Sequence, residues 1–182
     1  VAVSNLPLAP QDMDKLLPLC WQVIERPNFG YDFGAYREGI LAIREHLPKL
    51  EKLVLLNDSV WFPLPGTRDW IDDADALGTD VAAAVSNYGF DKRRWRTTKS
   101  VVWDYRSDRP GFHYCSFAMM LGAKVLSGPD FLRFWETFPL SNDKVLTVKR
   151  GEIGFSRWLL NRGYSHGETF DVYPIKLLCA LI

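Results

Sequence analysis

A short apolar run that ends abruptly in polar side chains constrains this chain more than any other feature of its sequence. Residues 53–56 read Leu-Val-Leu-Leu and are followed at once by Asn57, Asp58 and Ser59. The run is too short for a buried helix of ordinary length, so it indicates a strand covered on both faces, as in parallel sheets. Ligands of such sheets bind beyond the carboxyl ends of the strands, which makes Asp58 a candidate for contact with a metal or a diphosphate. Asn57 and Ser59 would add oxygen donors, and an Asx turn that only closes the strand is the alternative.

The composition limits the class of protein. With 182 residues, of which 47% are hydrophobic and 14% aromatic, the chain can bury a sizeable core, and we expect one domain over residues 1–182. The formal net charge is zero, so no global field favours a nucleic-acid partner. The odd set of cysteines, Cys20, Cys115 and Cys179, shows no metal-ligand spacing and favours a reduced, cytoplasmic compartment. No apolar stretch approaches the roughly 18 residues of a membrane span, and no secretory signal pattern is present.

Strand-like and helix-like segments alternate along the chain, which predicts an α/β domain with a mostly parallel sheet. Strands are expected at residues 21–26, 53–56, 81–85, 114–121 and 145–148, and helices at 12–17, 33–47, 129–138 and 152–162. The chain opens without Met, and residues 1–5 read as the end of a strand already under way. We therefore expect a domain taken from a longer polypeptide.

A second polar segment joins an expected strand to the helix that begins near Phe33. Gly30 allows a positive φ and close backbone approach by a ligand, while Asn28 and Asp32 supply polar groups on either side of Tyr31 at the amino end of the helix. The glycine spacing is not GxGxxG, so it supports neither a dinucleotide fingerprint nor a P-loop. The structural alternative is that Asp32 is the N-cap, Gly30 the turn and Tyr36 a core residue.

A third candidate is Glu152, which we expect in the first turn of a late helix that follows the strand at residues 145–148. A carboxylate at that place is also explained by the helix dipole alone. Asp32, Asp58 and Glu152 would each follow a separate strand. Carboxylates in that pattern are expected to meet at one edge of the sheet.

Other residues are weaker candidates. His113 and His166 could each supply a metal ligand, although a lone histidine is more often a surface or satisfied core residue. Trp61 and Trp95 lie beside the proposed site in the sequence and could stack on sugar rings. The basic residues among positions 92–99 lie in a long polar and aromatic stretch. They could attract a lipid-diphosphate acceptor, and a solvated loop is the alternative.

Four motifs in order resemble the rhamnan synthesis F family of glycosyltransferase-like domains: RPNFGYDFGAYREG, LVLLNDSVWFPL, HYCSFAMML with a downstream FLRFWE, and GEIGFSRWLLNRGY. The resemblance runs from residue 3 to residue 164, nearly the whole chain, and the four motifs lie between residues 26 and 164. The resemblance implies a role in building bacterial glycans that contain rhamnose. More distantly, the same blocks are similar to the GT-A fold of inverting glycosyltransferases. This implies a GT-A-like (Rossmann-like), mostly parallel sheet flanked by helices, with its first strand only partly present.

The resemblance also implies roles for particular residues. The residues that would contact the nucleotide sugar are Asn28, Gly30, Tyr31, Asp32, Asn57 and Ser59. Asp58 would hold Mg²⁺ or Mn²⁺, and Glu152 would be the catalytic base. Two positions depart from the wider pattern, because its Asp-x-Asp element reads Asn-Asp-Ser here and its late Glu-Asp pair reads Glu152-Ile153.

The expected activity is transfer of a deoxyhexose, L-rhamnose, from deoxythymidine diphosphate rhamnose to a bacterial surface polysaccharide or lipopolysaccharide acceptor, with inversion. Such a reaction needs charge neutralisation on the departing diphosphate and a carboxylate that takes the proton of the acceptor hydroxyl. We expect it in the cytoplasm, with peripheral contact at the inner face of the cell membrane left open. The alternative is a carbohydrate-binding or scaffolding domain without catalysis inside a multidomain glycan synthase.

Overall fold

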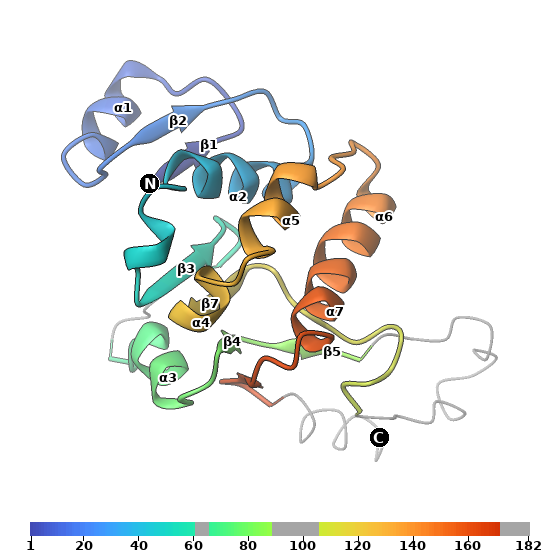
Figure 1. Cartoon of the computed structure of the whole chain (residues 1–182). Helices are drawn as coiled ribbons and strands as arrows, with labels where there is room; N and C mark the ends of the chain where they lie inside the picture. Colours follow the sequence, from blue (N-terminus) through green and yellow to red (C-terminus); the bar gives the residue numbers. More distant parts are fainter. Residues whose placement is uncertain (61–65, 89–105, 172–182) are drawn as a thin grey trace, which may run out of the picture. The chain divides into compact units, whose positions relative to one another are not determined.

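The computed structural model describes residues 1–60, 66–88 and 106–171, and Figure 1 shows their helices and strands. Contacts divide the chain into two compact units. Unit 1 comprises Val1–Leu53 and Gly122–Gly151, and unit 2 comprises Val54–Leu121 and Glu152–Ile182. Each unit is described by itself. The proposals at Trp61, at Trp95 and at the basic residues of 92–99 lie outside the described residues.

Unit 1 is built from one small parallel sheet and several helices. Strands β1 (Ala2–Ser4) and β2 (Val23–Glu25) pair in parallel, with Ala2 opposite Val23. The helical elements are α1 (Pro10–Leu16), α2 (Tyr31–Ala42), η1 (Leu47–Lys49), α4 (Ala123–Leu126), α5 (Phe131–Thr137) and α6 (Lys144–Thr147). The strand expected from the first residues of the chain is therefore present as β1.

Aromatic side chains hold α2 against α5 in the core of unit 1. The ring of Phe33 stacks on Trp135 with centroids 6.1 Å apart, and on Phe138 at 5.4 Å. Arg37 adds polar contacts, since its Nε donates to the carbonyl of Trp135 at 2.9 Å and its guanidinium also reaches the carbonyl of Glu136. The last carbonyls of a helix lack their usual backbone donor one turn further on. Arg37 supplies donors here, and the N–H of the C-cap residue Phe138 also donates to the Trp135 carbonyl at 3.4 Å.

The prediction of a strand at residues 145–148 is wrong, because this segment is helical. Helix α6, the π-helical segment η4 (Val148–Ile153) and α7 (Gly154–Leu160) follow one another without a break. Asp143 begins the run as an N-cap whose side chain accepts the N–H of Leu146 at 2.9 Å. The β-branched residues that suggested a strand are overridden by this cap and by the tertiary context. Glu152 therefore lies inside a helical run and not in a first turn, so the helix-dipole argument does not apply to it.

We expect Gly151→Ala to destabilise the fold, although Ala is a better helix former than Gly by about 1 kcal/mol. A Cβ at Gly151 would lie 2.5 Å from Cδ2 of the buried Phe33 ring. Overpacking of this kind costs about 1–3 kcal/mol, so the free energy of unfolding measured in urea should fall. Gly39→Ala in α2 is the control, because its Cβ would meet Val3 Cγ2 at 3.3 Å. Equal losses in the two variants would contradict the role given to the Phe33 contact.

Unit 2 contains a mixed four-stranded sheet in the order β3-β7-β4-β8. Its strands are β3 (Lys52–Leu56), β7 (Ala118–Gly122), β4 (Val81–Ala83) and β8 (His166–Glu168). β4 is antiparallel to β7 and parallel to β8. The expected α/β class is confirmed, whereas a mostly parallel sheet is not: the sheets are small and this one is mixed.

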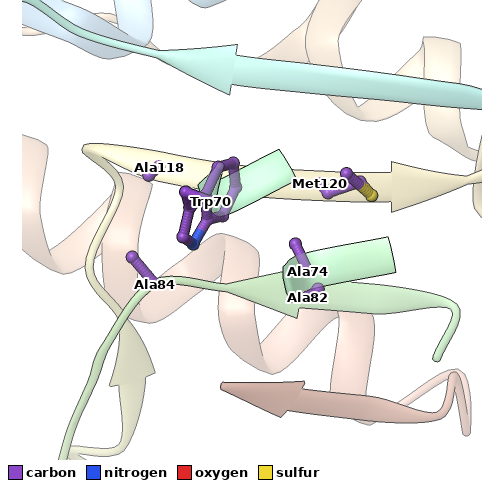
Figure 2. Close-up of a cluster of buried hydrophobic side chains, with 6 residues drawn as sticks. All are labelled: Trp70, Ala74, Ala82, Ala84, Ala118 and Met120. Carbon is purple, nitrogen blue, oxygen red and sulfur yellow. The ribbon is translucent and has the colours of Figure 1, made fainter. Parts of the chain in front are cut away.

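The carboxyl ends of β3, β4 and β8 share one edge of this sheet. The N–H of Asn57, just after β3, donates to the carbonyl of Phe117, just before β7, at 3.1 Å. The end of β3 therefore meets the start of β7, and these two strands are antiparallel. Since β7 is also antiparallel to β4, the strands β3, β4 and β8 run in one direction, as the arrows in Figure 2 show. We call the edge at their carboxyl ends the carboxyl edge.

The strand expected at residues 114–121 is divided between two sheets. Its first part is β6 (His113–Tyr114), which pairs antiparallel with β5 (Ser86–Asn87), and its second part is β7. The intervening residues 115–117 lie between the two sheets in sequence. The N–H of Cys115 donates to the carbonyl of Val85 at 3.0 Å, which anchors this connection to the end of β4 and the start of β5.

Small residues let a helix approach the sheet of unit 2. Figure 2 shows Trp70 and Ala74 of α3 (Trp70–Ala76) with a buried cluster that includes Ala82 of β4, Ala84 just after β4, and Ala118 and Met120 of β7. Alanines at these positions leave room for the indole of Trp70, which is 6% exposed. The Trp70 Nε1–H donates to Thr169 Oγ1 at 3.1 Å, so the polar end of the ring is also satisfied.

Candidate active site

The end of β3 forms a compact turn that carries an exposed carboxylate. The side-chain oxygen of Asn57 accepts the N–H of Ser59 at 3.0 Å. This is the Asx turn that the sequence allowed as an alternative. Asp58 and Ser59 are exposed, and Asn57 is half-buried. The oxygen of Asn57 is thus used within the turn, while the carboxylate of Asp58 faces solvent at the carboxyl edge.

Ser116 holds Glu152 at the same edge. The buried Ser116 hydroxyl donates to Glu152 Oε1 at 2.9 Å. The next residue, Phe117, accepts the N–H of Asn57. The consecutive residues Ser116 and Phe117 therefore connect the Glu152 carboxylate to the end of β3.

His113 faces the second oxygen of Glu152. His113 Nε2 lies 3.5 Å from Glu152 Oε2, and the two side chains are 10% and 25% exposed. The other ring nitrogen, Nδ1, lies 2.9 Å from the carbonyl oxygen of Gly111. A carbonyl oxygen only accepts, so Nδ1 carries the hydrogen of this bond and Nε2 is turned toward the carboxylate. We call Ser116, His113 and Glu152 the Glu152 cluster.

The backbone that carries Glu152 is itself unusual. Glu152 belongs to the π-helical segment η4. Such segments are rare and are found frequently at functional sites. The sequence singled out Glu152 but missed Ser116 entirely, and it considered His113 only as a metal ligand.

The loop at residues 28–32 belongs to unit 1, and its ligand role stays a prediction. The Gly30 N–H donates to Asn142 Oδ1 at 3.0 Å, and the Tyr31 hydroxyl donates to the carbonyl of Asn142, also at 3.0 Å. Gly30 has φ 88° and is the N-cap of α2, a place that the structural alternative gave to Asp32. Tyr36 is buried, as that alternative predicted. The backbone N–H expected to approach a ligand is therefore used within the protein, while Asn28 is exposed.

A buried tyrosine and His166 form a second polar pair in unit 2. The Tyr114 hydroxyl and His166 Nδ1 are 2.5 Å apart. Burial lowers the pKa of His166 below its ordinary value. Burial raises the pKa of Tyr114, with a further contribution from the negative charge of Glu168. Both effects favour the neutral forms, in which the tyrosine hydroxyl donates to the histidine nitrogen.

The lowered pKa of His166 predicts a loss of stability in mild acid. The ordinary pKa of histidine is 6.5. Below that pH the unfolded chain binds more protons at His166 than the folded chain does, so the free energy of unfolding decreases as the pH is lowered. Urea titrations at neutral and mildly acidic pH should show the fall, and His166→Gln should make it smaller. His46→Gln, at an exposed histidine, is the control. An identical fall in the His166→Gln protein would contradict the assignment.

The described residues limit how a metal could be held. In the ranges 1–60, 66–88 and 106–171, no three His, Cys, Asp or Glu side chains are grouped so that they could bind a metal ion. Mg²⁺ is often held by one or two carboxylates together with the phosphates of a substrate, so a metal at Asp58 stays a prediction. Among the same residues, no helix is long and apolar enough to cross a membrane.

Comparisons with known proteins place the chain in a family. It is 33% identical over 158 residues to the uncharacterized protein y4gN of Sinorhizobium fredii, a match that covers 86% of this chain and 37% of that protein. The chain thus spans well under half the length of this relative. No solved structure matches. The family described as rhamnan synthesis protein F matches residues 1–177. Because that match covers nearly the whole sequence, the chain belongs to the rhamnan synthesis protein F family.

Proposed function

We propose that this chain is a glycosyltransferase domain that moves L-rhamnose, a deoxyhexose, from a nucleoside diphosphate donor to a glycan acceptor with inversion. Glu152 is the catalytic base, and Asp58 lies at the diphosphate with Mg²⁺ or Mn²⁺. The acceptor is a bacterial surface polysaccharide or lipopolysaccharide, free or lipid-linked. Family membership supports a role in rhamnan synthesis, and the choice of sugar and donor depends on that membership.

The observation that carries the proposal is the position of Glu152. Its carboxylate is fixed by Ser116 directly ahead of β7, beside the end of β3 that bears Asp58. Ligands of open α/β sheets bind beyond the carboxyl ends of strands, and this is the edge at which β3, β4 and β8 end. Three co-directional strands with β7 running against them support a GT-A-like arrangement as part of the proposal.

The chemistry assigns each carboxylate a different task. Glu152 takes the proton of the acceptor hydroxyl as that oxygen attacks the anomeric carbon, and a single displacement needs one such base. A divalent ion held by Asp58 would neutralise the charge that develops on the departing diphosphate. Asn28, Gly30, Tyr31 and Asp32 are proposed to contact the nucleotide sugar, as are Asn57 and Ser59 near the metal.

A donor-turnover assay tests the proposal. The purified domain is incubated with deoxythymidine diphosphate rhamnose and Mg²⁺ or Mn²⁺, with and without an oligorhamnose acceptor, and released nucleoside diphosphate is measured. We expect release that increases with acceptor and that yields an elongated product. The corresponding glucose donor is the control, and it should react more slowly. Absence of release under all these conditions would remove the enzymatic proposal.

A carbohydrate-binding or scaffolding domain without catalysis is the second candidate. Two internal bonds favour it: the oxygen of Asn57 is used by Ser59, and the N–H of Gly30 is used by Asn142. Both groups were expected to face a nucleotide sugar. Calorimetry with the glycan and the donor-turnover assay together separate the candidates. A scaffold of this kind binds the glycan but releases no nucleoside diphosphate from the donor.

A further inference from the structure

We infer that the Glu152 cluster binds a vicinal diol of the glycan acceptor, that is, two hydroxyls on neighbouring ring carbons. Glu152 Oε2 binds the hydroxyl that reacts, and His113 Nε2 binds the hydroxyl beside it. His113 thereby determines which acceptors are bound, a role that differs from metal ligation. The part of this inference that concerns sugar transfer rests on the proposed function, whereas the part that concerns glycan binding does not.

Two hydrogen bonds within the cluster leave one atom of each side chain for a ligand. The Ser116 hydroxyl donates to Glu152 Oε1 at 2.9 Å, so Oε2 is the oxygen that remains for a further donor. The Nδ1–H of His113 donates to the carbonyl of Gly111, also at 2.9 Å. Among the residues that the structure describes, none forms a hydrogen bond with His113 Nε2.

The distance between these two atoms suits a pair of hydroxyls. His113 Nε2 and Glu152 Oε2 are 3.5 Å apart, which is longer than an ordinary hydrogen bond between nitrogen and oxygen. The hydroxyl oxygens on adjacent carbons of a sugar ring are slightly closer together than this, so each of them can face one of the two atoms. A hydroxyl donates to a neutral imidazole and accepts from a protonated one, so the fit does not depend on the charge of His113.

Partial burial makes the pair of atoms selective. The side chain of Glu152 is 25% exposed and that of His113 is 10% exposed, so a ligand can reach the carboxylate while the imidazole has little contact with water. A site that hydrogen-bonds a hydroxyl discriminates against an analogue without it, because the protein group then has no partner. We therefore expect acceptors with the diol to bind more tightly than acceptors with only the reacting hydroxyl.

The two hydroxyls have different fates in the transfer step. The oxygen of the reacting hydroxyl bonds to the anomeric carbon while its proton passes to Glu152, and the bond from that carbon to the diphosphate breaks with its electrons leaving on the diphosphate. The hydrogen bond between the second hydroxyl and His113 is the same before and during this step. Its loss should therefore raise KM for the acceptor and change kcat little.

Acceptors that lack single hydroxyls test the pairing. Oligorhamnose is compared with analogues that each lack one hydroxyl of the terminal sugar, by calorimetry and by steady-state kinetics. One analogue that is still elongated should bind on the order of tenfold more weakly than the intact acceptor, the usual effect of one net hydrogen bond. Its continued elongation shows that the missing hydroxyl is not the one that reacts.

His113→Asn connects that hydroxyl to the imidazole. Asn removes Nε2 but keeps an amide that can donate to the carbonyl of Gly111 in place of Nδ1. The variant should bind the intact acceptor on the order of tenfold more weakly, and the sensitive analogue should lose nothing further, because both changes remove the same hydrogen bond. Two losses that multiply would overturn the inference.

Ser156→Ala is the matched control for damage to β6. The buried Ser156 hydroxyl accepts the N–H of Tyr114, the neighbour of His113, at 2.9 Å. Its removal should lower the free energy of unfolding, while the tenfold preference for the intact acceptor remains. Loss of the preference in Ser156→Ala as well would assign His113 to the fold alone and overturn the inference.

Two further outcomes are decisive. If His113→Asn does not fold, the unmodified chain gives the answer, since equal affinity for the intact acceptor and all the analogues would overturn the inference. If no transfer is detected but calorimetry shows the preference and its loss in His113→Asn, the proposed function fails while the diol site stands.

Discussion

Glu152→Gln is expected to lower kcat for sugar transfer on the order of 10²-fold or more, within the usual contribution of a general base. The substitution keeps the size of the side chain, and its amide oxygen can still accept the hydroxyl of Ser116 at the position of Oε1. Its amide N–H would face His113 Nε2, which is an acceptor in the Nδ1–H tautomer. We therefore expect the free energy of unfolding to change little while basicity is lost.

Paired kinetic and stability measurements separate chemistry from folding. Steady-state kinetics should show a lower kcat with donor affinity close to that of the unmodified protein, and urea unfolding should show similar midpoints. Glu45→Gln removes an exposed carboxylate of unit 1 and should leave kcat unchanged. Near-normal turnover in Glu152→Gln would mean that Glu152 has a structural role, and Asp32 would become the next candidate for the base.

Asp58→Ala is expected to abolish the dependence of nucleoside diphosphate binding on a divalent ion. In the unmodified protein we expect tighter binding with Mg²⁺ or Mn²⁺ than with a chelator, because the exposed carboxylate would hold a hard cation that neutralises the charge of the diphosphate. Loss of the carboxylate should weaken the metal-dependent affinity on the order of 10–100-fold, comparable to other losses at metal sites.

Calorimetry with and without chelator measures this difference directly. Asp72→Ala is the control, since it removes an exposed carboxylate from the first turn of α3. Equal binding with and without metal in the unmodified protein would indicate a site in which cationic side chains neutralise the diphosphate. The basic residues of 92–99 would then be the groups to replace.

Local sequence signals account for much of unit 2 and for the residue at the centre of the candidate site. The run at residues 53–56 predicted β3, and the polar residues after it allowed an Asx turn as the alternative to a ligand site. The spacing from Phe33 predicted α2, although the helix ends at Ala42 and not near residue 47. A strand or helix with an apolar periodicity and polar residues at its end can be predicted from the sequence, because both signals come from neighbouring residues.

The remainder depends on contacts that sequence patterns do not encode. Residues 145–148 are rich in β-branched side chains, yet they become helical under the cap of Asp143. Ser116 was missed because its partner Glu152 is 36 positions away, and nothing near Ser116 signals a bond to a carboxylate. The tautomer of His113 is set by the backbone carbonyl of Gly111, and a backbone group gives no signal in the sequence. Short elements such as α3 and β8 carried too few residues for a periodicity to be recognised.

The connection between β6 and β7 has a consequence for insertions and deletions during evolution. Both partners of Glu152, His113 and Ser116, lie on the short span 113–116. That span is anchored by the bond from Cys115 to Val85 and, one residue further on, by the bond between Phe117 and Asn57. Only Ser116 lies between these anchors, so an added or deleted residue there would turn its hydroxyl away from the carboxylate. Relatives that keep this cluster should therefore vary in composition here but not in length, which makes the spacing a criterion for sorting active from inactive family members.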